Sequence, residues 1–165
     1  QEELANAKAS QEVFSDATDF TDVQTDLDTL NQNLKENGLE YVTVDAVMEA
    51  SDDSGQMLGY VLTVTDSEGY GGDIQLSMGV RMDGTLNGIS ILSISETAGL
   101  GMNADTDAFK SQFADKNVEQ FTYTKNGASA DNEIDAISGA TITTNAVTNG
   151  VNGGLLTFQY LKGGN

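Results

Sequence analysis

The sequence predicts an α+β fold in which an antiparallel β-sheet (a meander) is flanked by N-terminal helices and a C-terminal helix. Residues 41–95 alternate between apolar and polar side chains in runs separated by short turns, which is typical of such a meander. At 21–38 and 142–161, apolar residues instead recur every three or four positions, which is typical of amphipathic helices. A chain of 165 residues is long enough for one domain with a hydrophobic core.

Two helices are expected before the sheet. Residues 3–14 are rich in Ala, Glu and Gln, which favour a short helix. One face of the second helix is marked by four apolar residues at helical spacing: Val23, Leu27, Leu30 and Leu34. Thr21 is a candidate N-cap for that helix, and Gly38 is a candidate C-terminal stop. We therefore expect an N-terminal helical segment at 1–38 and the main domain at 39–165.

The sheet is expected to take its strands in sequence order from four segments: 41–49, 57–65, 74–82 and 86–95. The third segment alternates strictly and places five apolar residues on one side: Ile74, Leu76, Met78, Val80 and Met82. Glu68–Gly72 is expected to be a loop, and Asp83-Gly84 is a strong signal for a hairpin turn.

After the sheet, a helix is expected at 104–114 and a strand at 118–124. The last helix, 142–161, carries apolar residues on one face: Val147, Val151, Leu155 and Phe158. Three glycines inside this helix each cost about 1 kcal/mol relative to Ala: Gly150, Gly153 and Gly154. We expect them to allow close packing of the helix against the sheet.

The composition excludes several kinds of site. The chain has no Cys and no His, which rules out thiolate nucleophiles, disulfides, Fe–S clusters, His-ligated metals and Ser-His-Asp triads. The formal net charge is -19, so nucleic acid and anionic membrane surfaces are poor partners. Acidic clusters such as Asp52-Asp53 lack the pattern of a calcium loop, so no metal site is expected. No run of about 18 apolar residues is present, so we expect no membrane-spanning helix in this chain.

A loop of small residues precedes the last helix: residues 135–141, Asp-Ala-Ile-Ser-Gly-Ala-Thr. A phosphate can bind at such a place, because the first N–H groups of a helix lack intrahelical acceptors and the helix dipole favours negative charge. Gly139 permits a backbone geometry that is closed to other residues, and Ala140 keeps the loop narrow. The alternative is an ordinary turn in which Ser138 or Thr141 caps the helix.

Three further groups in this region can donate hydrogen bonds to phosphate oxygens. They are the Ser138 hydroxyl and the backbone N–H groups of Ile142 and Thr143, which lie near the helix start. Thr141 is not expected to act as a catalytic nucleophile, because no base lies near it in sequence. The sequence therefore suggests no catalytic residue here.

The pattern Asp-x-x-Ser/Thr-Gly-Ala-Ser/Thr resembles the flavinylation signature of the FMN-binding domain family. This family includes the G subunit of the Rnf complex and the C subunit of the sodium-translocating NADH:quinone oxidoreductase. The resemblance covers roughly residues 40–160, and the domain at 39–165 is expected to be the FMN-binding domain. It implies that FMN is joined covalently to Thr141 by a phosphoester bond, made by a dedicated flavin transferase. Asp135 either helps the transferase position Thr141 or holds the shape of the loop, and a plain turn-forming role is also open.

Residues 96–101, Glu-Thr-Ala-Gly-Leu-Gly, resemble the family segment Glu-Thr-Pro-Gly-Leu-Gly, which lies against the flavin. Ala98 stands in place of the usual Pro. The resemblance implies five cofactor-binding residues here: Glu96, Thr97, Gly99, Leu100 and Gly101. In this interpretation Thr97 bonds to the ring edge and Leu100 packs on its face; the alternative is an ordinary Gly-rich loop. Four tyrosines are expected to be packing residues rather than flavin stackers: Tyr60, Tyr70, Tyr123 and Tyr160.

The resemblance also implies a function. The chain would be an electron-transfer subunit with covalent FMN in a membrane redox complex that couples electron flow to ion transport, and an electron carrier rather than an enzyme by itself. Its partners would be the other subunits and the flavin transferase. The domain would lie on the extracytoplasmic side of the cell membrane, with residues 1–38 membrane-proximal and attached to an N-terminal membrane helix absent from this chain. Two alternatives are a free-standing flavinylated extracellular electron carrier and a non-redox acidic interaction domain.

Overall fold

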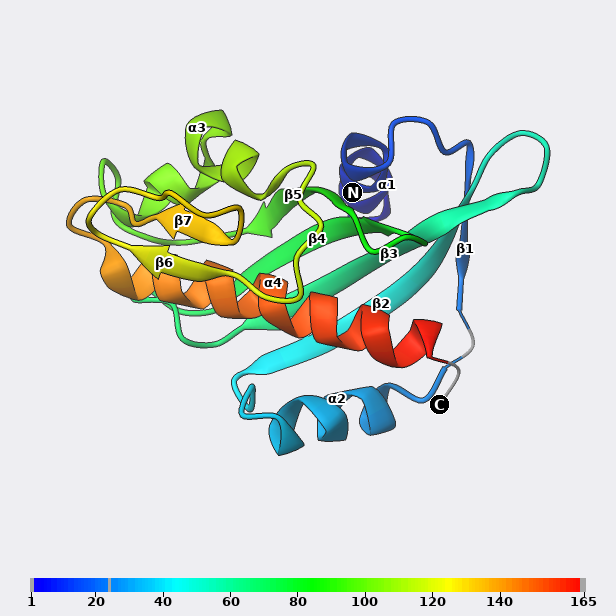
Figure 1. The fold of residues 1–165 in the computed structure, drawn as a ribbon, viewed down its shortest axis with the longest axis horizontal. Helices are drawn as coiled ribbons and strands as arrows, with labels where there is room; N and C mark the ends of the chain where they lie inside the picture. Colours follow the sequence, from blue (N-terminus) through cyan, green and yellow to red (C-terminus); the bar gives the residue numbers. More distant parts are fainter. Residues whose placement is uncertain (1, 24, 164–165) are drawn as a thin grey trace.

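A computed structural model describes residues 2–23 and 25–163 (Figure 1). Its centre is an antiparallel sheet of five strands in the order β1-β2-β3-β4-β5. The strands are β1 (Asp19–Asp22), β2 (Val42–Ser51), β3 (Met57–Asp66), β4 (Ile74–Arg81) and β5 (Leu86–Ser93). Helices α2 (Leu27–Glu36) and α4 (Thr141–Lys162) cover one face, and α1 (Glu2–Val13) covers the other. The predicted α+β class with its antiparallel meander is thereby confirmed.

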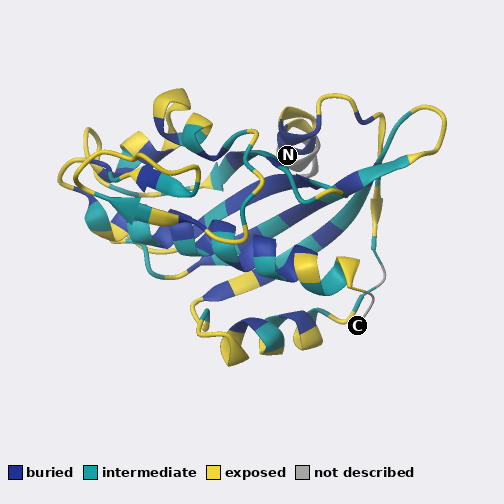
Figure 2. Cartoon of the chain, in the orientation of Figure 1, coloured by how far each residue is buried: buried dark blue, intermediate teal, exposed yellow. Residues whose placement is uncertain are grey.

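The hydrophobic core is divided between the two faces of the sheet, as the buried stripes of Figure 2 show. On the α4 face, the alternating residues of β4 are fully buried: Ile74, Leu76, Met78 and Val80. On the α1 face, a smaller cluster forms around Phe14, which is also fully buried. Glycines at 59 and 79 leave room for this ring, because a Cβ at either position would lie within 3 Å of a Phe14 ring carbon.

The start of the chain differs from the prediction at one element. Thr21 is not a helix N-cap, because residues 19–22 form β1 and pair with the edge of β2. Helix α2 begins at Leu27, and its N-cap is Asp26, whose carboxylate accepts from the N–H of Asp28 at 3.0 Å. Backbone pairing with an open sheet edge has overridden the helical spacing before residue 27. The predicted stop at Gly38 is confirmed, with φ of 83°.

The region after the sheet is more irregular than predicted. The expected helix at 104–114 is three short pieces: η1 (Gly101–Asp105), α3 (Asp107–Lys110) and η2 (Ser111–Phe113). The break lies at Thr106, whose backbone is extended and whose hydroxyl caps α3 by accepting from the N–H of Phe109 at 3.3 Å. The expected strand at 118–124 is reduced to β6 (Thr122–Thr124), which pairs in parallel with β7 (Glu133–Asp135).

Helix α4 packs closely on the sheet through its glycines, as expected. A Cβ on Gly153 would lie 2.5 Å from Cγ1 of Val42, and one on Gly154 would overlap the side chain of Met78. A Cβ on Gly150 would instead meet Leu76 Cδ2 at 3.4 Å, an ordinary contact. Gly153 and Gly154 thus determine how near the helix axis approaches the sheet. No helix among the described residues is both long enough and apolar enough to cross a membrane.

One carboxyl group is buried beside α4. Asp66, at the end of β3, is 1% exposed, and its Oδ1 accepts from the N–H of Glu68 at 2.6 Å, while Oδ2 has no partner. Burial is the main cause that raises the pKa of Asp66 to about 8, and the nearby Glu68 and Asp73 carboxylates add to the rise. The Asp66 carboxyl is therefore protonated in the folded protein at neutral pH.

We predict that Gly153→Ala destabilises the protein by about 1 kcal/mol, because the cost of overpacking against the stiff Val42 side chain exceeds the gain in helix propensity. Gly150→Ala is the matched control on the same helix. It should raise the free energy of unfolding by up to about 1 kcal/mol, since its methyl group has room. Urea denaturation measures both; equal stabilisation by the two substitutions would contradict the close packing at 153.

We predict that Asp66 makes the fold less stable as pH rises. The folded-state pKa is raised from 3.8 to about 8, so the folded protein holds a proton that the unfolded chain releases in this window. Its stabilising contribution is complete below pH 3.8 and is lost as pH rises through about 8. Asp66→Asn should remove this part of the pH dependence. The free energy of unfolding of the variant should therefore rise relative to that of the wild type between pH 5 and pH 8. Free energies of unfolding at both pH values measure the difference; a constant difference would refute a buried protonated Asp66.

Candidate functional site

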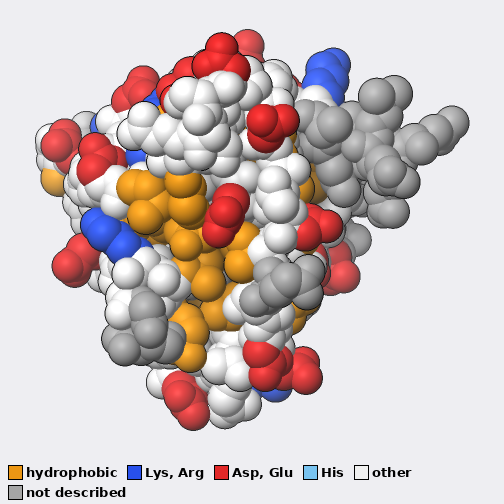
Figure 3. All heavy atoms as spheres, turned by 90° about the vertical axis from the view of Figure 1, so that its right-hand side faces the viewer, with side chains coloured by type: hydrophobic (Ala, Val, Ile, Leu, Met, Phe, Trp, Pro, Cys, Tyr) orange, Lys and Arg blue, Asp and Glu red, His pale blue; other side chains and the backbone are white. Residues whose placement is uncertain are grey.

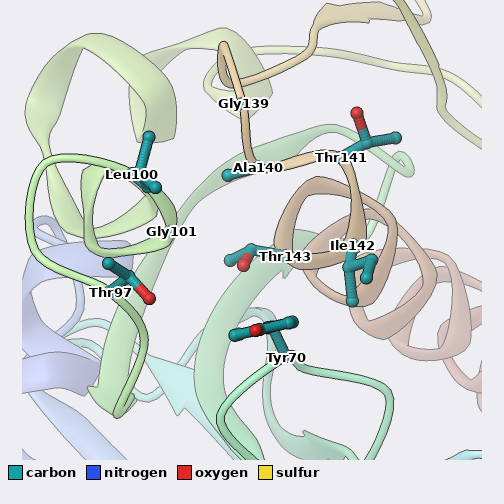
Figure 4. A pocket seen from close by; sticks show the side chains of 9 residues that line it. All are labelled: Tyr70, Thr97, Leu100, Gly101, Gly139, Ala140, Thr141, Ile142 and Thr143. Carbon is teal, nitrogen blue, oxygen red and sulfur yellow. The ribbon is translucent and has the colours of Figure 1, made fainter.

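A cavity of about 530 Å³ lies at the N-terminal end of α4 (Figure 4). Three segments that are distant in sequence form its walls: the loop after β3, the segment after β5, and the loop that leads into α4. Its lining residues are all uncharged: Tyr70, Thr97, Leu100, Gly101, Gly139, Ala140, Thr141, Ile142 and Thr143. The fold thus brings together the two sequence segments that were singled out separately.

The helix end at the cavity offers backbone donors. The N-cap residue of α4 is Ala140, which has no side-chain acceptor, and no side-chain cap bond is made. The N–H groups of Thr141, Ile142 and Thr143 therefore have no acceptor within the helix. Because α4 is 22 residues long, its dipole places partial positive charge at the same point. This end of the cavity suits an anion.

The loop before α4 is held by a buried hydroxyl that the sequence analysis did not single out. Thr144 is fully buried; its Oγ1 accepts from the N–H of Ile137 at 3.0 Å and donates to the carbonyl of Ala140 at 2.9 Å. Gly139 has φ of 74°, a left-handed geometry that favours glycine. A Cβ there would approach Leu100 Cδ2 at 3.1 Å, so the glycine also keeps the cavity open.

Exposed apolar side chains surround the cavity. Among the described residues, four large hydrophobic side chains are exposed, and three of them line this cavity: Tyr70 at 73%, Ile142 at 53% and Leu100 at 43%. The expectation that Tyr70 is a packing residue is therefore wrong. The sequence signal for an exposed Tyr70 is its place between Gly69 and Gly71, because glycines on both sides indicate a loop rather than a core position. Exposed apolar groups around one opening suit a flat apolar ligand.

The segment after β5 forms one wall. The carbonyl of Thr97 accepts from the N–H groups of Leu100 and Met102 at 3.1 and 3.0 Å, which closes a tight turn. Gly99 has φ of 79° and lies in this turn, outside the cavity lining. Gly101 is buried, and a Cβ on it would lie 2.5 Å from Oγ1 of Thr143. A side chain at 101 would therefore overlap Thr143 and Glu96, and glycine lets this segment lie close to the first turn of α4.

Besides Gly99, three residues predicted for the site are not among those that line the cavity. Glu96 is not among the lining residues, and its carboxylate accepts from two lining residues, Tyr70 and Thr143, and from Gly71. Asp135 lies in β7, where its Oδ1 accepts from the N–H of Ala128 at 2.6 Å. Ser138 is exposed in the loop and is not among the lining residues.

The electrostatics of the molecule oppose binding of free anions at long range. Figure 3 shows acidic side chains spread over one face and few basic ones, in keeping with a net charge of -19. The cavity itself carries no charged side chain, so a phosphate there would be held by backbone N–H groups and hydroxyls. The residues present fit FMN, with donors for the phosphate at the helix end and apolar walls for the ring.

Comparison with known proteins agrees with this geometry. The model of the FMN-binding domain family matches residues 69–155, which include every lining residue of the cavity. The chain is 33% identical over 159 residues to the G subunit of the Na(+)-translocating ferredoxin:NAD(+) oxidoreductase complex of Acetobacterium woodii, covering 95% of this chain and 75% of that protein. It is 43% identical over 102 residues to the G subunit of the proton-translocating ferredoxin:NAD(+) oxidoreductase complex of Clostridium ljungdahlii. This match covers 62% of this chain and 54% of that protein.

Two solved structures share the fold. NqrC of Shewanella oneidensis superposes with a TM-score of 0.62 at 16% identity, covering 94% of this chain and 88% of that one. The C subunit of the Na(+)-translocating NADH-quinone reductase from Parabacteroides distasonis gives a TM-score of 0.56 at 21% identity. This match covers 94% of this chain and 82% of that one. Because the family model matches more than half of the chain and the similarity to the Acetobacterium protein runs along nearly all of it, this chain belongs to the FMN-binding domain family.

Proposed function

We propose that this chain is an electron carrier whose FMN is esterified through its phosphate to Thr141, and that it serves as a subunit of an ion-translocating oxidoreductase complex. One observation carries the proposal: Thr141 is the first residue of an uncapped helix and lines an uncharged cavity with apolar walls. FMN, when bound, supplies the redox chemistry. The protein supplies attachment, orientation and exclusion of water from one side of the ring.

The proposed roles of the lining residues follow from their positions. The N–H groups of Ile142 and Thr143 hold the phosphate at the helix end. Leu100 and Tyr70 lie on the walls where a flat ring would be covered, and Thr97 can bond to the ring edge. Gly101 leaves room for Thr143 and Glu96, and Gly139 leaves room for Leu100. Ser138, which is exposed in the same loop, is a further donor for the phosphate.

Covalent attachment has a physical purpose in so acidic a chain. A net charge of -19 disfavours the approach of an anionic cofactor, so reversible binding through a few backbone donors would be weak. A phosphoester bond retains the cofactor whatever that affinity is. In forming it, the Thr141 oxygen bonds to phosphorus while the phosphoanhydride bond of an activated flavin donor breaks. The leaving group takes the electron pair, and the hydroxyl proton passes to a base of the transferase.

The proposed complex and its location rest on similarity. Relatives of this chain are named as G subunits of ion-translocating oxidoreductase complexes, and the chain spans about half the length of two of them, from Clostridium ljungdahlii and Methanosarcina acetivorans. We propose that other subunits deliver and remove electrons, and that a flavin transferase matures the chain. The resemblance to the family also supports a domain on the extracytoplasmic side of the cell membrane, with residues 1–38 nearest to it.

We predict that protein produced with an active flavin transferase gains the mass of FMN less one water, and that Thr141→Val abolishes the gain. Valine keeps the shape of threonine but has no hydroxyl to esterify. Thr141→Ser should still accept the cofactor, and Ser138→Ala is the control in the same loop. Intact mass spectrometry and absorbance measure the adduct. An adduct that persists on Thr141→Val and is lost in Ser138→Ala would show that Ser138 carries the flavin; one that persists in both variants would show that another residue does.

The sidedness can be tested because the chain has no Cys. In the full protein in its native membrane, Asp53→Cys at this exposed position should add labelling by a membrane-impermeant maleimide in intact cells, relative to the same protein without the substitution. The position lies in the loop between β2 and β3, away from the cavity. Permeabilised cells provide the control for total labelling. Reaction only after permeabilisation would place the domain in the cytoplasm and contradict the proposal.

A further inference from the structure

The Glu96 carboxylate connects two segments that form the cavity. Its Oε1 accepts from the N–H of Tyr70 at 2.9 Å and from the hydroxyl of Thr143 at 2.5 Å. Its Oε2 accepts from the N–H of Gly71 at 2.5 Å. One half-buried side chain, which is not among the lining residues, thus joins the loop after β3 to the first turn of α4.

The neighbouring glycines show how closely Glu96 fits. A Cβ on Gly71 would lie 2.8 Å from Oε2 of Glu96 and would also overlap the carbonyl oxygen of Ser95. A Cβ on Gly101 would lie 2.7 Å from Cβ of Glu96 and 2.5 Å from Oγ1 of Thr143. One glycine beside the carboxylate and one beside the Cβ of Glu96 are therefore needed for this contact, which a loosely placed surface carboxylate would not require.

The chemistry of the contact favours a carboxylate over an amide. All three partners present a hydrogen-bond donor, and an ionised carboxylate is an acceptor at both oxygens. A glutamine would place its NH₂ group against at least one of these donors. Hydrogen bonds to a charged acceptor are also the stronger class. The site therefore distinguishes Glu from Gln although the two have the same shape.

We propose that Glu96 is a positioning residue, which fixes Tyr70 and the start of α4 at the separation that the flavin ring requires, without lining the cavity itself. Tyr70 is 73% exposed, and the described structure gives its ring no hydrogen bond or aromatic partner. The backbone contact to Glu96 is accordingly what holds it at the cavity wall. The link to the flavin rests on the function proposed above, whereas the link between the segments does not.

The first test needs no cofactor. In Glu96→Gln, NMR should show that hydrogen exchange of the Tyr70 and Gly71 amides is faster by roughly tenfold to a hundredfold. Loss of a hydrogen bond to a charged acceptor changes the exchange rate by about this factor. Amides within β3 and β4 should keep their protection, which shows that the fold is intact. Glu68→Gln is the matched control, because it removes a charge in the same loop but its carboxylate contacts Asn145 and Asn149. Unchanged exchange at both residues 70 and 71 would overturn the proposal.

A second variant tests the contact with the helix. Thr143→Val removes the hydroxyl that bonds to Glu96, and Thr143→Ser restores it. If Glu96 joins the two segments, Thr143→Val should accelerate exchange at Tyr70 and Thr143→Ser should not. Equal exchange in the valine and serine variants would show that Glu96 holds the loop alone, and the proposed coupling to α4 would be refuted.

The loaded protein tests the consequence for the flavin. A tyrosine held against the ring quenches flavin fluorescence, so loaded Glu96→Gln should fluoresce more than the loaded wild type and approach Tyr70→Leu. Wild-type fluorescence in loaded Glu96→Gln, together with a rise in Tyr70→Leu, would contradict the positioning role. If the wild type takes up no FMN, the proposed function fails, and amide exchange still decides whether Glu96 holds the loop.

Discussion

The close packing of α4 on the sheet is the contact on which the rest of the site depends. Gly153 and Gly154 let the helix approach Val42 and Met78 more closely than any side chain would permit. The helix is thereby held close to the sheet at these two positions, and its first turn lines the cavity together with the loop after β3 and the segment after β5. A longer distance between α4 and the sheet would separate Thr143 from the Glu96 carboxylate.

The site is assembled from backbone geometry more than from charged side chains. The cavity lining has no ionisable group other than the Tyr70 phenol, and the donors for an anion are N–H groups of a helix whose N-cap is alanine. An acidic chain can hold a phosphate in this way, because local dipoles act at short range whereas its net charge acts at long range. The same contrast explains why a covalent bond would be useful: local donors orient the group but do not retain it against a negative field.

Polar side chains join the segments of this region. Thr144 holds the loop before α4, Glu96 joins two walls, and Asp66 lies protonated beneath the helix. Thr144 and Asp66 are buried, where hydrogen bonds are stronger because water is excluded, whereas Glu96 is half-buried. The large side chains that line the cavity, in contrast, are apolar and exposed: Tyr70, Leu100 and Ile142.

The sequence by itself determined the meander, the last helix and the loop at 135–141, because local alternation, helical spacing and small-residue motifs depend on near neighbours. It also indicated that residues 96–101 belong to the site. Only the tertiary structure decided that residues 19–22 form an edge strand, that the segment at 104–114 breaks at Thr106, and that Tyr70 lies at the cavity. It alone revealed that Glu96 faces the loop rather than the opening. These features arise where a segment meets a partner distant in sequence, and such contacts override local propensity.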